Sequence, residues 1–378
     1  MKTLSSIEVV SILNPLDMKK TDRRKFITNT ALASIAAVGG FRNMSAISSP
    51  VPSGSPSDSL TRNTQSKSKR DLMMQVLDMS STPAYIPAGF FMHFGVKGDA
   101  AIKSHLEYFR ATDMDFLKIQ FDELSLPQND QIKSAKDWAK IPILPEKWFE
   151  PALYLLKNLV KEVKSEAMVI QTLYSPYQMA KQAVPWNTLV EHVKQDAESV
   201  CRGMENITLS IMHFVQAAAR LGADGFYTCT QGGETNRIAD LSLFNRAIKN
   251  YDMILYKEVS QLVPYNIMHI CDYDGKYEDF ALRFQDYPGQ VINVPLEADN
   301  KPLSLMGAAG IFKRPVMGGL DRHGILSKGS PDDVKKATTE VLKNAPPNMI
   351  LSANCTVDKN IPIENLKTAI KTAHEFRM

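Results

Sequence analysis

Two residues near the end of an apolar run, His269 and Cys271, could ligate one metal ion. A β-strand alternates its faces with a period of two, so both side chains of the stretch "YNIMHIC" (265–271) are predicted to point the same way. Cys355 follows a second apolar run, "NMILSAN" (348–354). Two thiolates and an imidazole, with a fourth position open, are a ligand set of catalytic zinc. The pattern predicts a metal site, and packing in the core is the alternative for each residue taken alone.

The chain has four cysteines in 378 residues, too few for a disulfide scaffold. Cys201 falls in a predicted helix, and Cys229 falls in a predicted strand with its trailing loop. We predict both to be buried structural thiols, because free cysteine is among the most buried residue types.

The elements that must position these residues begin at about residue 71, where apolar runs start to alternate with amphipathic helical segments. This order is typical of a parallel sheet. Eight runs predict an α/β fold with a single (β/α)8 TIM-type barrel, and an open doubly wound sheet is the alternative. The predicted strands are 88–95, 115–121, 167–176, 223–230, 265–271, 291–295, 314–320 and 348–354. The predicted helices are 99–113, 148–164, 188–221, 241–263 and 362 to the C-terminus.

The carboxyl ends of barrel strands are where such enzymes collect their chemistry. Residues that directly follow the apolar runs are therefore expected to surround the three candidate ligands and to line a substrate pocket. They are His93, Asp122, Glu123, Tyr174, Ser175, Gln231, Glu234, Asn293 and Asp321.

Composition and charge exclude several classes of protein. With 44% hydrophobic and 22% charged residues the chain is typical of globular proteins, and no run approaches the roughly 20 apolar residues that span a bilayer. The first 47 residues hold seven of the 44 basic residues and three of the 41 acidic ones, which leaves a net charge of −1 for the remainder. The body therefore gives no electrostatic reason to expect nucleic acid as a partner.

The N-terminal segment is predicted to be a targeting signal and not part of the folded domain. In "TDRRKFITNTALASIAAVGGF" (21–41), the pair Arg23 and Arg24 precedes a weakly apolar run, which resembles a bacterial twin-arginine export signal. A basic amphipathic helix is the alternative. We predict a signal region at 1–47, a Ser/Pro-rich linker at 48–72 and a barrel at 73–378. The expected location is the periplasm or cell envelope.

Several motifs in order carry a resemblance to a known family. They are "LGADGFYTCTQGG" (221–233), "MHICDYDG" (268–275), "RPVMGGLD" (314–321) and "NMILSANCTVDKNIPIENLKTAI" (348–370). From about residue 83 onward the chain resembles the uroporphyrinogen decarboxylase superfamily. That superfamily includes zinc-dependent methyltransferases, which move a methyl group from a corrinoid to coenzyme M. The match to the methyltransferase branch lies in His-x-Cys on one strand and Cys on the last.

The resemblance implies zinc held by His269, Cys271 and Cys355, a thiol substrate at the fourth position and a corrinoid or corrinoid protein as methyl donor. Glu234 or Gln231 is a candidate for the fourth position when substrate is absent. Asp321 is expected either to orient His269 through its second ring nitrogen or to cap the "GGLD" turn (318–321). His93, Tyr174 and Asn293 are expected as pocket residues.

Two alternatives remain open from the sequence. A porphyrinogen decarboxylase would bind many carboxylates, for which arginine is the usual partner, but no arginine lies between Pro83 and Asp99. Arg110, Arg237 and Arg322 are the remaining candidates. A non-catalytic corrinoid- or metal-binding envelope protein would keep the three ligands without turnover.

Overall fold

The computed structural model describes residues 68–120, 126, 131–271 and 275–377. The predicted export signal, most of the predicted linker, and the candidates Asp122 and Glu123 lie outside these residues. Within the described ranges, no helix is both long and apolar enough to cross a membrane.

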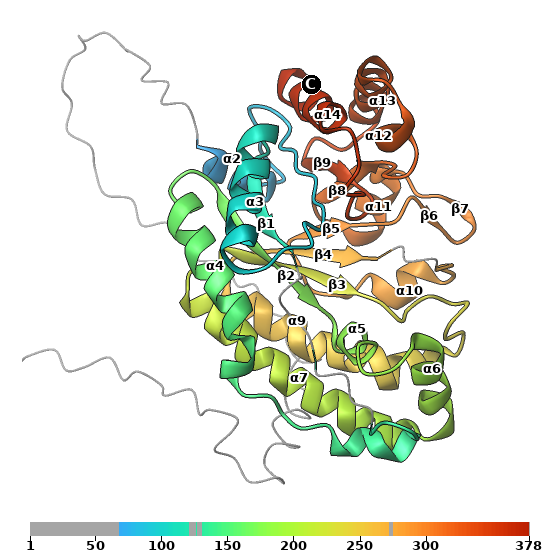
Figure 1. Ribbon diagram of the computed structural model, residues 1–378. Coiled ribbons are helices and arrows are strands. Elements are labelled where there is room, and N and C mark those ends of the chain that lie inside the picture. Colours follow the sequence, from blue (N-terminus) through green and yellow to red (C-terminus); the bar gives the residue numbers. More distant parts are fainter. Residues whose placement is uncertain (1–67, 121–125, 127–130, 272–274, 378) are drawn as a thin grey trace, which may run out of the picture. The chain divides into compact units, whose positions relative to one another are not determined.

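Seven parallel strands form one sheet in the order β1-β2-β3-β4-β5-β8-β9, a half-barrel of the TIM type (Figure 1). Each falls within a predicted strand. Their bounds are β1 (Phe116–Ile119), β2 (Met168–Tyr174), β3 (Gly225–Thr230), β4 (Tyr265–Ile270), β5 (Val291–Asn293), β8 (Val316–Leu320) and β9 (Met349–Ala353). Because neighbours are parallel, all the carboxyl ends lie at one edge of the sheet.

The predicted first strand, 88–95, is wrong as a regular strand. Ala88 makes an isolated parallel bridge with Leu351 of β9, and its carbonyl accepts a hydrogen bond from Asp115 N, just before β1 (3.0 Å). The segment thus lies between the first and last strands of the sheet. It pairs with β9 only locally: Gly89 N donates to Leu351 O (3.0 Å), whereas the Ala88 N–H donates to the Asp115 carboxylate (2.7 Å).

Strand alternation fills the interior of the sheet and also supplies the site. A buried apolar cluster inside the curve of the sheet includes Phe116, Tyr227 and Ile267. Two residues further along the same strands stand Lys118, Cys229 and His269, which share a face with the cluster since strand side chains repeat every second residue.

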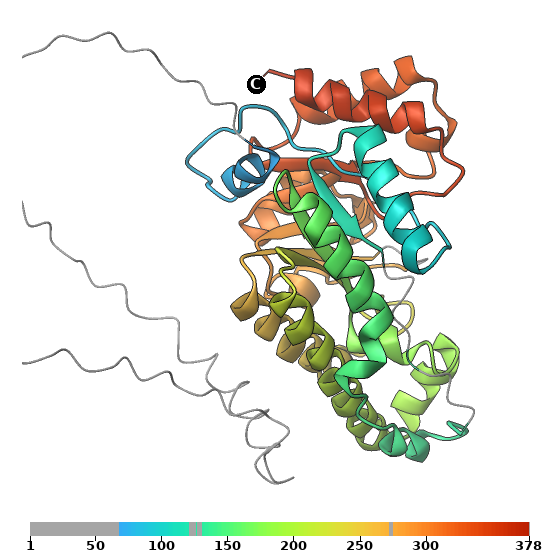
Figure 2. The ribbon, with the colours of Figure 1, turned by 60° about the vertical axis from the view of Figure 1, so that its left-hand side comes forward.

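Six helices form a row in which each packs on the next: α9 (Asn250–Leu262), α7 (Ala197–Arg220), α4 (Glu150–Val163), α3 (Gly98–Thr112), α14 (Ile363–Glu375) and α13 (Pro331–Lys343). Figure 2 shows α3 and α4 running side by side in front of the sheet. On α4, Leu155, Leu159 and Val163 are buried at helical spacing, as the sequence predicts.

Two predicted helices are interrupted. The segment 188–221 divides at Asp196, whose extended backbone breaks the helix and whose side chain caps α7 by accepting from Ser199 N (3.0 Å). The segment 241–263 contains a π-helical turn, η4 (Asn245–Lys249), between α8 (Leu241–Phe244) and α9. The remaining elements are α2 (Lys69–Val76), η2 (Ala135–Lys140), η3 (Glu146–Phe149), α5 (Pro176–Ala180), α6 (Trp186–Gln195), α10 (Phe280–Phe284), β6 (Glu297–Ala298), β7 (Lys301–Pro302), α11 (Leu305–Phe312) and α12 (Ile325–Lys328).

Helix α2 crosses the boundary predicted between linker and barrel at residue 72, because Ser68 and Asp71 form a capping box that starts the helix earlier. Asn348, which directly precedes β9 and is 1% exposed, connects this strand by hydrogen bonds to the end of α2 and the chain after it. Its Nδ2 lies within 3.2 Å of the carbonyl oxygens of Val76, Asp78 and Ser81.

We expect Asn348→Ala to lower the free energy of unfolding by about 1–3 kcal/mol, because the variant loses three hydrogen bonds between a buried side chain and the backbone. Urea unfolding followed by circular dichroism measures the change. Asn344→Ala, at the exposed residue that follows α13, is the control and should change the value by less than about 0.5 kcal/mol. Equal unfolding midpoints for Asn348→Ala and the wild type would show that these hydrogen bonds do not contribute to stability.

Candidate metal centre

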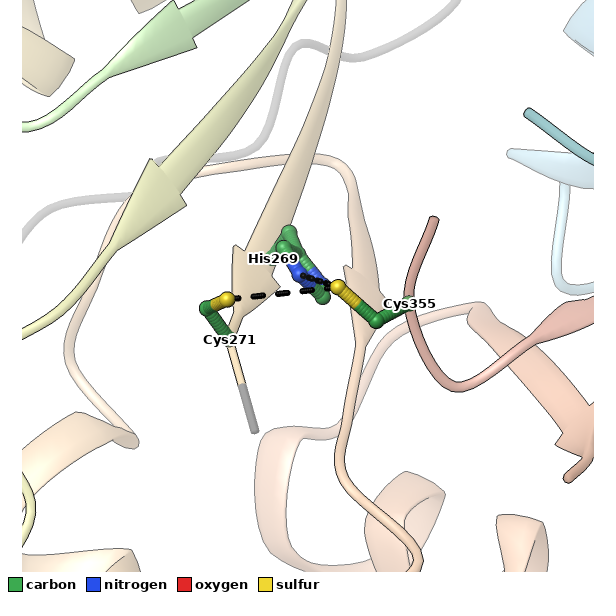
Figure 3. Close-up of side chains that lie close together, drawn as sticks. All are labelled: His269, Cys271 and Cys355. Atoms are coloured by element: carbon green, nitrogen blue, oxygen red, sulfur yellow. Dashed lines mark hydrogen bonds between the residues drawn. The ribbon is translucent and has the colours of Figure 1, made fainter. Parts of the chain in front are cut away.

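His269, Cys271 and Cys355 come together at the carboxyl edge of the sheet (Figure 3). His269 is the penultimate residue of β4, Cys271 directly follows that strand, and Cys355 lies two residues after β9. His269 Nε2 lies 3.4 Å from Cys355 Sγ, and the two sulfur atoms are 3.9 Å apart. All three ligand atoms lie within 4.8 Å of one another.

The two separations that involve Cys355 Sγ match edges of a zinc tetrahedron. Zn–S bonds of about 2.3 Å and Zn–N bonds of about 2.0–2.1 Å at tetrahedral angles place two sulfurs about 3.8 Å apart and sulfur and nitrogen about 3.6 Å apart. The observed values are 3.9 Å and 3.4 Å. Donor types and spacing therefore suit a metal such as zinc, and the three protein ligands leave a fourth position for another group.

The two thiols share one proton unequally in the metal-free protein. The hydrogen bond from Cys271 holds the pKa of Cys355 well below its ordinary value, helped by His269 and Arg322. The same hydrogen bond, together with burial, raises the pKa of Cys271 well above its ordinary value. Cys355 is therefore the thiolate and Cys271 the thiol that donates to it.

Metal binding should consequently release the Cys271 proton. We expect the zinc dissociation constant to fall about tenfold per pH unit, because the ligand must be deprotonated. Competition with a chromophoric chelator between about pH 7 and pH 8.5 measures this slope. A dissociation constant that does not change over this range would contradict the assigned thiol–thiolate pair.

Packing holds the His269 ring in place. Tyr227 stacks on it with ring centroids 5.0 Å apart, and the Tyr227 hydroxyl donates to Asn293 Oδ1 (2.6 Å). Asn293, predicted as a pocket residue, thus lies buried behind the site.

Among the described residues, His269 Nδ1 has no hydrogen-bond partner. Asp321 instead accepts from His323 N (2.8 Å) and caps its own turn, so the alternative in which it orients His269 is not observed.

The two predicted occupants of the fourth position have other roles. Glu234 is fully buried and forms an ion pair with Arg237 (2.8 Å), while its other oxygen accepts from Gly232 N (2.6 Å). Gln231 reaches the site with its Nε2, which donates to Cys271 Sγ (3.2 Å). An amide nitrogen is a donor and not a metal ligand, so the geometry favours neither residue as the fourth ligand.

A cavity of about 640 Å³ opens beside the three ligands. His93, Tyr174 and Gln231, which were named from the sequence as pocket residues, line it. Arg322, named from the sequence only for the decarboxylase alternative, lines it too. Lys118, Lys181 and Cys229 also line the cavity and were not among the predicted pocket residues. For Lys118 a signal existed, since it stands two residues after Phe116 in a predicted strand and must share the inward face.

Lys118 is 5% exposed and lies between aromatic rings. Its Nζ is 4.5 Å from the Tyr227 ring centroid and 4.8 Å from that of Phe91, and it donates to Gln120 Oε1 (3.0 Å). Cys229 is buried as predicted, and burial raises its pKa strongly. Its position in the cavity wall was not predicted.

Comparisons with known proteins agree with this architecture. The family model "Uroporphyrinogen decarboxylase (URO-D)" matches residues 98–376. A methyltransferase from Methanosarcina mazei superposes with a TM-score of 0.66 at 12% identity, over 82% of this chain and 99% of that one. A Listeria monocytogenes protein described as a vitamin-B12-independent methionine synthase has a TM-score of 0.50 at 12% identity, over 78% and 97%. No curated protein sequence matches the chain.

Proposed function

Because the chain belongs to the uroporphyrinogen decarboxylase (URO-D) family, whose members include decarboxylases and methyltransferases, we propose that it is a metal-dependent methyltransferase. It moves a methyl group from a corrinoid donor to the sulfur of a small thiol. The observation that carries this proposal is the grouping of His269, Cys271 and Cys355 around one point. The fold shared with the Methanosarcina methyltransferase supports it.

The three ligands would hold zinc at the wall of the cavity. When bound, zinc supplies a Lewis acid that favours the thiolate form of a substrate thiol at neutral pH. The cavity would hold the substrate thiol and the methyl donor close to each other, which favours their reaction. In the transfer a C–S bond forms and the Co–C bond breaks, both electrons of that bond stay on cobalt, and the thiol proton leaves to solvent.

The decarboxylase alternative has less support. Of its three candidate arginines, Arg322 lines the cavity, whereas Arg237 is paired with Glu234 and Arg110 is exposed on α3. Lys118 and Lys181 add positive charge to the cavity. They suit an anionic ligand of any kind, but they lack the bidentate geometry with which arginine binds carboxylates.

The proposal is tested by loading the protein with zinc and incubating it with methylcobalamin and a panel of thiols. We expect loss of methylcobalamin absorbance with formation of one methyl thioether, and no reaction with Cys271→Ser/Cys355→Ser. In parallel, uroporphyrinogen III is offered and its products are separated. Loss of carboxyl groups from uroporphyrinogen III would favour the decarboxylase instead. Corrinoid binding without turnover with any thiol would favour the non-catalytic binding protein.

A further inference from the structure

A hydrogen-bonded chain of three side chains ends on one sulfur of the candidate metal centre. It consists of Lys181, which follows α5, Gln231, which follows β3, and Cys271. Lys181 Nζ donates to Gln231 Oε1, and Gln231 Nε2 donates to Cys271 Sγ (3.2 Å). Gln231 is 4% exposed, so water has little access to this contact.

Lysine fixes which end of the Gln231 amide faces the sulfur. An ammonium group has three donors and no acceptor, so it must meet the amide oxygen. The two ends of an amide are otherwise hard to distinguish. With Oε1 held by Lys181, the NH₂ group is directed at Cys271, and the positive charge polarises the amide so that its N–H becomes a better donor.

We propose that Gln231, oriented by Lys181, is a positioning residue that donates a hydrogen bond to the Cys271 sulfur and withdraws negative charge from it when a metal is bound. Cys355 receives no equivalent amide among the described residues, and its neighbours are Cys271 and His269. The two sulfur ligands would therefore differ in donor strength. The inference rests on the metal site of the proposed function and not on methyl transfer.

A sulfur ligand that accepts a hydrogen bond holds its electrons more tightly. Removing the bond should make the sulfur easier to oxidise, and sulfur-to-metal charge-transfer bands should then move to lower energy. Partners of metal ligands also affect metal affinity, by about 10–100-fold when they are removed. Both effects can be measured without catalytic turnover.

The experiment uses the full chain loaded with Co²⁺, whose thiolate charge-transfer bands are visible. We expect Gln231→Leu to shift these bands to lower energy and to weaken Co²⁺ binding about 10–100-fold. Lys181→Met should shift these bands in the same direction by a smaller amount. Lys181→Arg, which keeps the positive charge, should show the wild-type bands. Gln178→Leu is the matched control. Gln178 lies on α5, just before Lys181, and lines the same cavity, and its replacement should leave the bands unchanged.

Lys181 is only partly buried, so Lys181→Met tests the inference even if Gln231→Leu fails to fold, which circular dichroism would report. Wild-type bands in folded, cobalt-loaded Gln231→Leu or Lys181→Met would overturn the inference and leave the metal site intact. A wild type that binds no Co²⁺ or Zn²⁺ would overturn both the inference and the proposed function.

Discussion

Replacing Cys271 and Cys355 together by serine should abolish zinc binding, from about one zinc ion per chain to nearly none. Serine is close to cysteine in size, but its hydroxyl stays protonated at neutral pH and is a poor ligand for zinc. Zinc sites rich in thiolate have apparent binding free energies of about 10–16 kcal/mol. Removing two of three protein ligands leaves only His269, which cannot supply this affinity alone.

Elemental mass spectrometry on protein purified without chelator measures the zinc content. Cys201→Ser is the matched control, because Cys201 lies on α7 with its Sγ 3.7 Å from the Arg246 carbonyl oxygen. That variant should keep its zinc. A wild type that is folded but free of zinc would refute the metal site, and the resemblance to methyltransferases would then concern the fold alone.

Glu234→Gln should destabilise the protein by about 3–5 kcal/mol, the usual cost of removing one partner from a buried ion pair. Both side chains of the pair are nearly inaccessible, with Glu234 at 0% and Arg237 at 4% exposed. A guanidinium cannot lose its proton, so Arg237 would keep a buried charge without this counter-charge. Urea unfolding measures the loss.

The reciprocal variant, Arg237→Gln, should lose less of the free energy of unfolding at low pH than at neutral pH. Burial raises the pKa of Glu234 against the opposing effect of Arg237, so without Arg237 the carboxyl can take up a proton in the folded state. A group with a raised folded pKa contributes stability that is present below its unfolded pKa and is lost as pH rises through the folded pKa. The stability of Arg237→Gln should thus fall as pH rises above about 4.3, the ordinary value for glutamate.

Zinc content separates this structural role of Glu234 from a role as ligand. We expect folded Glu234→Gln to hold as much zinc as the wild type, since the carboxylate is engaged by Arg237 and Gly232. Loss of zinc from a folded Glu234→Gln protein would mean that Glu234 reaches the metal after all.

Much of the site follows from sequence order alone. The period of two in a strand places His269 and Cys271 on one side, and parallel strands bring the residue after β9 to the same edge as the residue after β4. The first is a local rule of the strand backbone, whereas the approach of Cys355 to His269 also depends on the curvature of the sheet, because β5 and β8 lie between β4 and β9. The shared face of His269 and Cys271, seven strand positions and the spacing of buried residues on α4 could therefore be predicted from the residues.

The tertiary structure decided which polar side chains meet. Gln231, Glu234 and Asp321 all follow strands, yet Gln231 donates to the candidate ligand Cys271, Glu234 pairs with Arg237 and Asp321 caps its own turn. In the segment 88–95, the Ala88 N–H donates to the carboxylate of Asp115 and not to a neighbouring strand. Such outcomes depend on competition among donors and acceptors far apart in the chain, and sequence spacing holds no information on which partner wins.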